Sequence, residues 1–171
     1  MLHWVLYTTA IGTLAAVFAL SVRHKLRDFP RFKASLGAYR LFPDSLLPLA
    51  APAVVALELA AIIALFLPLG PGLWIAFGLL CLYTLAITIN LLRGITAIDC
   101  GCGDQPTPIS GWLLLRNGAL LLIAFPQDPA STGGTIAGWV LVAVLVVVAL
   151  LFYLTIEQLL ANQFVREVGD G

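Results

Sequence analysis

Long apolar runs separated by short polar segments dominate this chain, and their lengths predict membrane-spanning helices. A helix needs about 20 predominantly apolar residues to cross the hydrocarbon core of a bilayer. Residues 2–22 contain no Asp, Glu, Lys or Arg, and the only charged residue between Asp44 and Arg93 is Glu58. The predicted spans are residues 2–22, 47–68, 72–92, 109–125 and 135–157.

The number of spans depends on two places where the apolar pattern is interrupted. The run Pro-Leu-Gly-Pro-Gly from Pro68 to Gly72 is a turn composition that a straight helix does not tolerate, so it predicts a hairpin. Residues 109–125 are short for a span and carry Arg116, so this segment either crosses the membrane fully or is re-entrant. The pattern therefore predicts four to five transmembrane helices.

Residues 25–42, after the first span, follow a different pattern. Apolar residues recur there at spacings of three or four, and basic residues fill the gaps. The apolar positions are Phe29, Phe32, Leu36, Tyr39 and Phe42, and the basic positions are Arg27, Arg31, Lys33 and Arg40. This pattern is typical of a basic amphipathic helix that lies in the membrane interface. Such a helix either connects two spans along the headgroups or caps a site and docks a partner.

Composition supports the same fold class. The chain is 61% hydrophobic and only 11% charged, whereas soluble domains are roughly 45–50% apolar and about 25% charged. We therefore expect an all-α, polytopic membrane helix bundle, in a single domain of residues 1–171, with the lipid bilayer as its surroundings. Nine Lys and Arg balance nine Asp and Glu, so no net charge recruits nucleic acid. The first span is followed, not preceded, by basic residues, which predicts a retained anchor and not a cleaved signal peptide.

The most distinctive chemical feature is the sequence Cys100-Gly101-Cys102 in the polar segment 93–110. Glycine between the cysteines permits the backbone angles that bring two such close sulfur atoms together. A disulfide closed over one residue is strained, and strained disulfides are the exchangeable kind. This favours thiol-disulfide chemistry, as an oxidoreductase or an electron relay. The alternatives are a protein that binds or transports a thiophilic metal or a small sulfur compound, and two ordinary loop cysteines.

Several charged residues are candidates for tuning this site. Arg93, Arg116 and the start of the following helix favour thiolate formation, whereas Asp99 and Asp104 disfavour it. Glu58 lies near the middle of the second predicted span, where an ionisable group is a functional candidate.

We expect Glu58 to face the bundle interior, neutral or paired with Arg116 or Asn90. It is then either a proton acceptor for thiol oxidation, a contact to a quinone headgroup, or a packing polar group. Cys81 lies among leucines, which predicts a buried structural cysteine outside the site. No nucleotide or catalytic-metal motif is evident in the sequence, and the one cofactor that it leaves open is a membrane quinone.

The distribution of basic residues predicts the orientation of the chain. With five spans, every Lys or Arg outside the hydrocarbon falls on the side of segment 93–110. The positive-inside rule makes that side cytoplasmic.

Six motifs in order along residues 1–125 resemble the MauE family of methylamine utilisation proteins, relatives of the DoxX-like membrane proteins. They are His24-Lys25-Leu26-Arg27-Asp28, Tyr39-Arg40-Leu41, Glu58-Leu59, Asn90-Leu91-Leu92-Arg93-Gly94, Asp99-Cys100-Gly101-Cys102-Gly103 and Arg116-Asn117.

The resemblance implies an accessory role in the maturation of a disulfide-rich partner such as periplasmic methylamine dehydrogenase. It further implies a bacterial inner-membrane location and a thioredoxin-like partner protein. In that role Cys100 and Cys102 exchange disulfides, with Glu58, Arg93 and Arg116 tuning them. A periplasmic role requires segment 93–110 to face outward, which conflicts with the charge count, and on the sequence alone the charge count has slightly more weight.

Overall fold

The structure, a computed structural model, describes residues 2–41, 43–67, 71–95, 98, 109–125 and 134–169. Three predicted features fall outside the described residues. They are Phe42, the cysteines Cys100 and Cys102, and residues 68–70 of the predicted turn.

The described residues are almost entirely helical, which confirms the predicted fold class. The helices are α1 (Leu2–Arg27), α2 (Phe29–Ala38), the 3₁₀ turn η1 (Asp44–Leu46), α3 (Leu47–Leu65), α4 (Pro71–Leu92), α5 (Gly111–Ile123) and α6 (Ile136–Gly169). Within the described ranges, four helical segments are long and apolar enough to cross a membrane, and α5 is a shorter apolar helix. The chain is therefore a polytopic membrane helix bundle.

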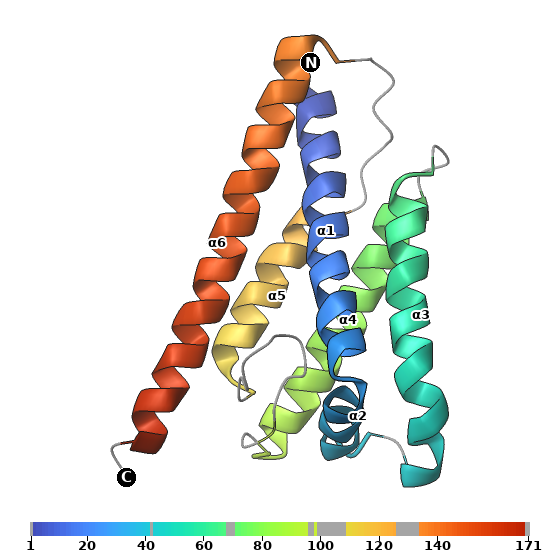
Figure 1. The fold of residues 1–171 in the computed structure, drawn as a ribbon, viewed down its shortest axis with the longest axis vertical. Helices are drawn as coiled ribbons and strands as arrows, with labels where there is room; N and C mark the ends of the chain where they lie inside the picture. The colour runs from blue at the N-terminus through green and yellow to red at the C-terminus, as the bar shows by residue number, and fades with distance from the viewer. Residues whose placement is uncertain are drawn as a thin grey trace.

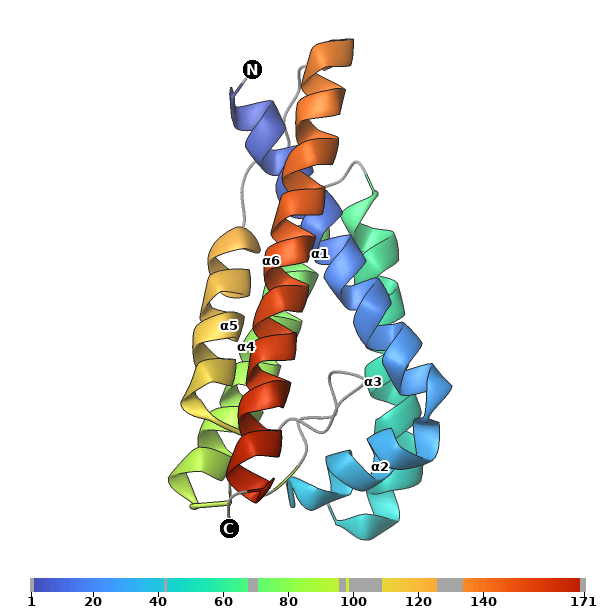
Figure 2. The ribbon, with the colours of Figure 1, turned by 60° about the vertical axis from the view of Figure 1, so that its left-hand side comes forward.

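Helices α1, α4 and α6 run in one direction and α3 and α5 in the opposite direction, and α1 is central to the bundle (Figure 1). Its most extensive contacts are with α6 and α3, whereas α4 packs between α3 and α5. Helices α1 and α4 end, and α3 and α5 begin, at the same end of the bundle, which we call the basic end. The short helix α2 lies across this end, as Figure 2 shows.

The boundary between α1 and α2 differs from the sequence prediction of an amphipathic helix over residues 25–42. Helix α1 continues to Arg27, because basic residues in a last turn complement the negative end of the helix dipole. Asp28 then caps α2 by accepting a hydrogen bond from the Arg31 N–H, and a proline follows at the start of α2. Helix α2 ends at Ala38, and Arg40 has a positive φ of 49°.

The last two helices also differ in length from the predicted spans 109–125 and 135–157. Helix α5 has 13 residues, which corresponds to about 20 Å at 1.5 Å per residue, against roughly 30 Å for the hydrocarbon core. Helix α6 has 34 residues and continues past the predicted span, through residues 158–169. That segment contains good helix formers and no glycine or proline before Gly169, so the backbone continues as a helix.

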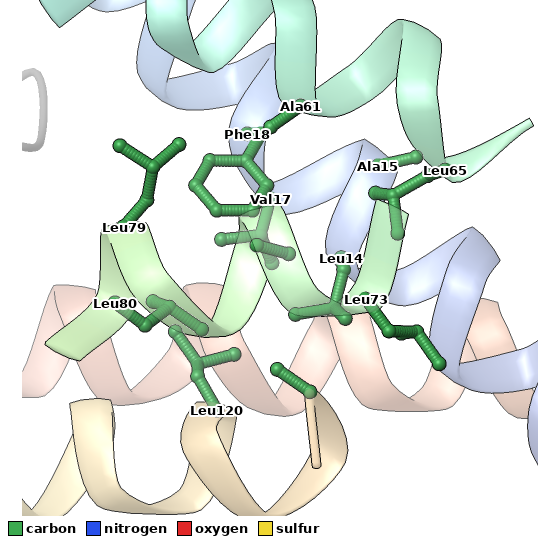
Figure 3. Close-up of a cluster of buried hydrophobic side chains, with 12 residues drawn as sticks. Leu14, Ala15, Val17, Phe18, Ala61, Leu65, Leu73, Leu79, Leu80 and Leu120 are labelled. Atoms are coloured by element: carbon green, nitrogen blue, oxygen red, sulfur yellow. The ribbon is translucent and has the colours of Figure 1, made fainter. Parts of the chain in front are cut away.

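The main apolar core joins α1, α3, α4 and α5 (Figure 3). Its members include Leu14 and Phe18 of α1, Ala61 of α3, Leu80 of α4 and Leu120 of α5. A second cluster at the basic end contains Tyr39, Ile87, Ile109 and Leu113. A third joins α1, α2 and α3 through Val22, Phe32, Ala51 and Val55. The apolar face of α2 thus packs on the bundle.

Helix α6 is attached to α1 near the N-terminus of the chain. The rings of Trp4 and Trp139 meet edge to face with centroids 5.0 Å apart. A Cβ atom added at Gly138 would lie 3.1 Å from the Trp4 ring, so this glycine permits the close approach. Most of the remaining α6 surface is exposed and apolar, as expected for a helix that faces lipid.

The position of Cys81 differs from the buried position that the sequence predicted. Its side chain is exposed on the outer face of α4, where we expected a buried cysteine. The reason is that α4 is apolar on all sides, because its outer face meets hydrocarbon, so apolar neighbours do not distinguish the core from the lipid.

The tight contact between α3 and α4 predicts a strong effect of substitution at Gly72. A Cβ atom there would lie 2.4 Å from the Leu65 Cα atom, and that backbone cannot move aside. We expect Gly72→Ala to destabilise the protein by about 1–3 kcal/mol, measured by thermal unfolding in detergent.

Gly78→Ala is the matched control, because nothing lies within 4 Å of a Cβ atom at this position of the same helix. We expect it to be neutral or stabilising by up to about 1 kcal/mol. Equal melting temperatures for the two variants would contradict the close α3–α4 packing.

Candidate functional site: a buried ion pair beneath an amphipathic cover

Glu58 is fully buried in α3, and one of its carboxylate oxygens accepts hydrogen bonds from two other helices. The Lys25 ammonium of α1 lies 2.5 Å from Oε1. The hydroxyl groups of Ser21 on α1 and Tyr83 on α4 donate to the same oxygen at 3.1 and 2.8 Å. Among the described residues, Oε2 has no hydrogen-bond partner. The carboxylate thus joins three helices through a single oxygen.

Lys25 is buried like its partner, with 3% of its side chain exposed against 0% for Glu58. It donates a second hydrogen bond to Ser21 Oγ at 3.0 Å. Its ammonium nitrogen also lies 5.2 Å from the ring centroids of both Phe32 and Tyr83, a distance at which an aromatic face attracts a cation. Because Phe32 belongs to α2, the amphipathic helix covers the ion pair.

Helical geometry explains why a lysine from a basic cluster enters the bundle. The buried face of α1 follows the positions Leu14, Phe18 and Val22, and the next position on that stripe is Lys25. Ser21 precedes Lys25 by one turn, so both reach the same point of α3. The neighbours Arg23 and Arg27 lie on other faces of the helix and are exposed.

A second ion pair lies between α5 and α6. Arg116 is buried, and its Nη1 atom lies 2.6 Å from Glu157 Oε1. The Tyr153 hydroxyl donates to the same Glu157 oxygen at 3.0 Å, and the Arg116 guanidinium lies 5.5 Å from the Tyr153 ring centroid. This cluster connects α6 to α5. It lies well beyond Trp139, the residue by which the start of α6 contacts Trp4.

The partner predicted for Glu58 was wrong. The sequence suggested Arg116 or Asn90, but Glu58 binds Lys25 and Arg116 binds Glu157. Asn90 is fully buried in α4 and donates to its own helix, at the Ala86 carbonyl oxygen. The prediction counted only charges inside the apolar runs, so it left out the residues that α1 and α6 carry past the ends of those runs.

The segment that contains the two cysteines begins and ends in contact with the core. Ile109 N–H donates to the Ile98 carbonyl oxygen at 3.2 Å, so the chain leaves and returns at one point. Ile98 and Ile109 pack with Tyr39, Ile87 and Leu113 of the cluster at the basic end. Residues 99–108, which include Cys100 and Cys102, come between Ile98 and Ile109 in the sequence and lie outside the described residues.

The structure separates the other predicted site residues. Arg93 immediately follows α4 and is exposed at the basic end, whereas Glu58 and Arg116 are buried in different clusters. No group of three or more His, Cys, Asp or Glu that could hold a metal ion exists among the described residues.

Sequence reasoning missed Ser21, Lys25 and Tyr83 around Glu58, and Tyr153 and Glu157 around Arg116. The signal for Lys25 was present in the helical period, because Lys25 lies three residues after Val22 on the buried face of α1. Tyr153 and Glu157 are one turn apart at the end of the last apolar run, which is the spacing for a shared site.

Comparison with known proteins identifies relatives with a common description. Residues 2–126 match the family model of methylamine utilisation protein MauE. The MauE protein of Paracoccus versutus is 32% identical over 143 residues, covering 79% of this chain and 75% of the relative. That of Methylorubrum extorquens is 36% identical over 128 residues, covering 69% of each chain.

A third relative is matched over a smaller share of its length. The MauE protein of Paracoccus denitrificans is 35% identical over 115 residues, which cover 65% of this chain and 62% of the relative. No solved structure matches this chain.

The buried pair predicts that removing one charge destabilises the protein more than removing both. Lys25→Met leaves the Glu58 carboxylate buried without its counter-charge, and we expect it to cost about 3–5 kcal/mol. The double variant Lys25→Met/Glu58→Gln removes both charges, and we expect it to recover at least half of that loss. Thermal unfolding in detergent measures both.

Lys33→Met is the matched control, since Lys33 lies on α2 and is partly exposed. We expect a change of less than about 0.5 kcal/mol, as for most surface substitutions. Additive losses in the double variant would show that the two groups do not interact.

Proposed function

Because this chain belongs to the MauE family of methylamine utilisation proteins, we propose that it exchanges thiols and disulfides at the membrane through Cys100 and Cys102. In the exchange, a cysteine thiolate attacks a sulfur of a partner's disulfide and forms a mixed disulfide. The second cysteine then displaces the partner as a dithiol. The reverse direction oxidises the partner and leaves the cysteines of this chain reduced.

The observation that carries the proposal is the anchored base of the cysteine segment. A dithiol that exchanges disulfides needs access to a partner, together with a fixed position relative to the rest of its protein. The hydrogen bond from Ile109 to Ile98 and the packing of both residues on Tyr39 and Ile87 hold the two ends of the segment at the basic end of the bundle. This arrangement supports a loop-borne dithiol on a rigid support.

The charged residues of the candidate site have different roles in this proposal. Arg93 is exposed at the start of the polar segment, and its positive charge favours the thiolate form of a nearby cysteine. Arg116 positions α6 through Glu157. Glu58 holds Lys25 and Tyr83 beneath α2, so it acts on the exchange through the packing of the basic end.

The family name suggests the biological setting. We propose that the chain assists the maturation of a disulfide-rich protein of methylamine utilisation, such as methylamine dehydrogenase, in the bacterial inner membrane. A thioredoxin-like protein is the proposed exchange partner, because its dithiol is the usual donor or acceptor in such reactions.

Maturation of a disulfide-rich protein requires an oxidising compartment, so the proposed function predicts that the basic end faces outward. The charge count predicts the opposite. Lys25 does not contribute to the count of basic residues at the membrane surface, because it is buried and paired with Glu58. Arg31 and Lys33 belong to α2, which packs on the bundle by its apolar face, and interfacial helices of this kind bind either leaflet. Arg23, Arg27 and Arg93 stay exposed at the basic end, so the charge count still favours the cytoplasm, and the outward orientation is expected from the proposed function alone.

The exchange reaction predicts that both cysteines of the pair are essential and that Cys81 is not. We expect Cys100→Ser and Cys102→Ser each to abolish exchange with a thioredoxin-like protein, with one variant accumulating the mixed disulfide. Alkylation followed by mass analysis measures the redox state of each cysteine.

Cys81→Ser is the control, because Cys81 is exposed on the outer face of α4 and not in the polar segment. It should exchange at the rate of the unaltered protein. Full exchange activity in both variants of the pair would refute the proposed function.

The orientation predicts the labelling of a single cysteine on intact cells. In a variant whose only cysteine is Cys102, an impermeant maleimide should react rapidly before the membrane is opened. Labelling only after permeabilisation would place the basic end in the cytoplasm and would exclude the maturation role.

A further inference from the structure

A cavity of about 120 Å³ lies beside the Lys25–Glu58 pair, between α2, α3 and α4. Its walls are mainly apolar and aromatic. They include Phe32, Tyr39, Val54, Tyr83, Ala86 and Ile87. An engineered apolar cavity of about 150 Å³ in another protein binds one benzene molecule. The space beside Lys25 therefore has the size of a single six-membered ring.

The polar end of this cavity favours a neutral ligand with a hydrogen-bond acceptor. Lys25 lines the cavity and donates to Ser21 and Glu58, which leaves one of its three N–H donors without a partner among the described residues. The charge of the ammonium group is already balanced by Glu58, and the pair is neutral whichever group holds the proton. An anionic ligand such as a fatty acid therefore meets no net charge, whereas a carbonyl oxygen meets a buried donor.

The cavity reaches the outer surface of the bundle. Leu82 lines it, yet 52% of that side chain is exposed on the face of α4 that meets lipid. A ligand that enters from the bilayer through this opening can leave an apolar tail among the acyl chains. This matches an amphiphile with a small ring for a head and a hydrocarbon tail.

The cavity and the base of the cysteine segment share side chains. Tyr39, Leu41 and Ile87 line the cavity and also belong to the cluster that holds Ile98 and Ile109. A ring bound beside Lys25 is thus one layer of side chains away from the residues where the cysteine segment begins and ends.

From these observations we infer that the cavity binds the ring of a membrane quinone, with Lys25 donating a hydrogen bond to one carbonyl oxygen. The inference rests on the proposed function for its redox role, and it names the electron acceptor. The Cys100 and Cys102 thiols lose two electrons and two protons as the S–S bond forms. The two carbonyl oxygens of the quinone gain both electrons and both protons, which gives the quinol.

Binding is tested separately from thiol chemistry in the Cys100→Ser/Cys102→Ser variant, reconstituted in lipid nanodiscs. The probe is a benzoquinone with a one-unit isoprenoid tail, and isothermal titration calorimetry measures its affinity. We expect saturable binding. Ala86→Phe in this background fills the cavity and should weaken binding about tenfold or more, which corresponds to about 1.4 kcal/mol. Ala86→Leu is the smaller substitution and should weaken it in the same direction.

The matched control is Ala60→Phe, since Ala60 is exposed on α3 and does not line the cavity. It should bind the probe with unaltered affinity. The pair-neutral variant Lys25→Met/Glu58→Gln should also bind about tenfold more weakly, because it lacks the donor. Absence of saturable binding, equal binding by the Ala86 and Ala60 variants, or equal competition by a ring-free alcohol such as decanol would overturn the inference.

The redox step is tested in the chain with both cysteines intact. Reduced protein should convert the benzoquinone to quinol with formation of one disulfide for each quinol, and Ala86→Phe should lose this reaction but keep exchange with oxidised glutathione. Exchange with glutathione in an unaltered protein that does not reduce the quinone would overturn the inference and leave the proposed function intact. Quinone binding without any exchange would refute the proposed function alone.

Discussion

A charge in the hydrocarbon core must find its partner inside the protein, because the surrounding lipid offers neither water nor hydrogen bonds. Glu58 meets this requirement through Lys25, Ser21 and Tyr83, which come from the helices on either side of α3. The pair thereby fixes the positions of α1, α3 and α4 relative to one another. Phe32 of α2 closes over it, so the position of the amphipathic helix depends on the same interaction.

At the basic end, the ion pair, the cavity and the cluster beneath the cysteine segment adjoin one another. The ion pair borders the cavity, and the cavity shares Tyr39 and Ile87 with the cluster beneath the cysteine segment. Helix α6 packs along α1, where Val142 and Val146 lie beside Trp4, and the Glu157–Arg116 pair joins α6 to α5 near the basic end. The opposite face of α6 is exposed and apolar, which fits a helix at the edge of a bundle that α1, α3, α4 and α5 form.

Much of the candidate site was predictable, because an ionisable residue inside an apolar run is conspicuous in any sequence. Glu58 and Arg116 were identified in this way, and both are buried. Their partners were not, since Lys25 and Glu157 lie at the ends of apolar runs, where a charge usually meets the headgroups. Cys81 was misplaced because a membrane helix is apolar on its lipid face as well as on its core face.

The sequence by itself determined the all-helical membrane fold, the approximate spans and the amphipathic character of the segment after the first helix. These follow from local patterns, because apolar length and helical period act within one element. Only the tertiary structure decided that Lys25 pairs with Glu58, that α2 covers this pair, and that a cavity remains between α2, α3 and α4. Those features depend on how each helix is rotated about its axis, and that rotation is set by contacts between residues far apart in the chain.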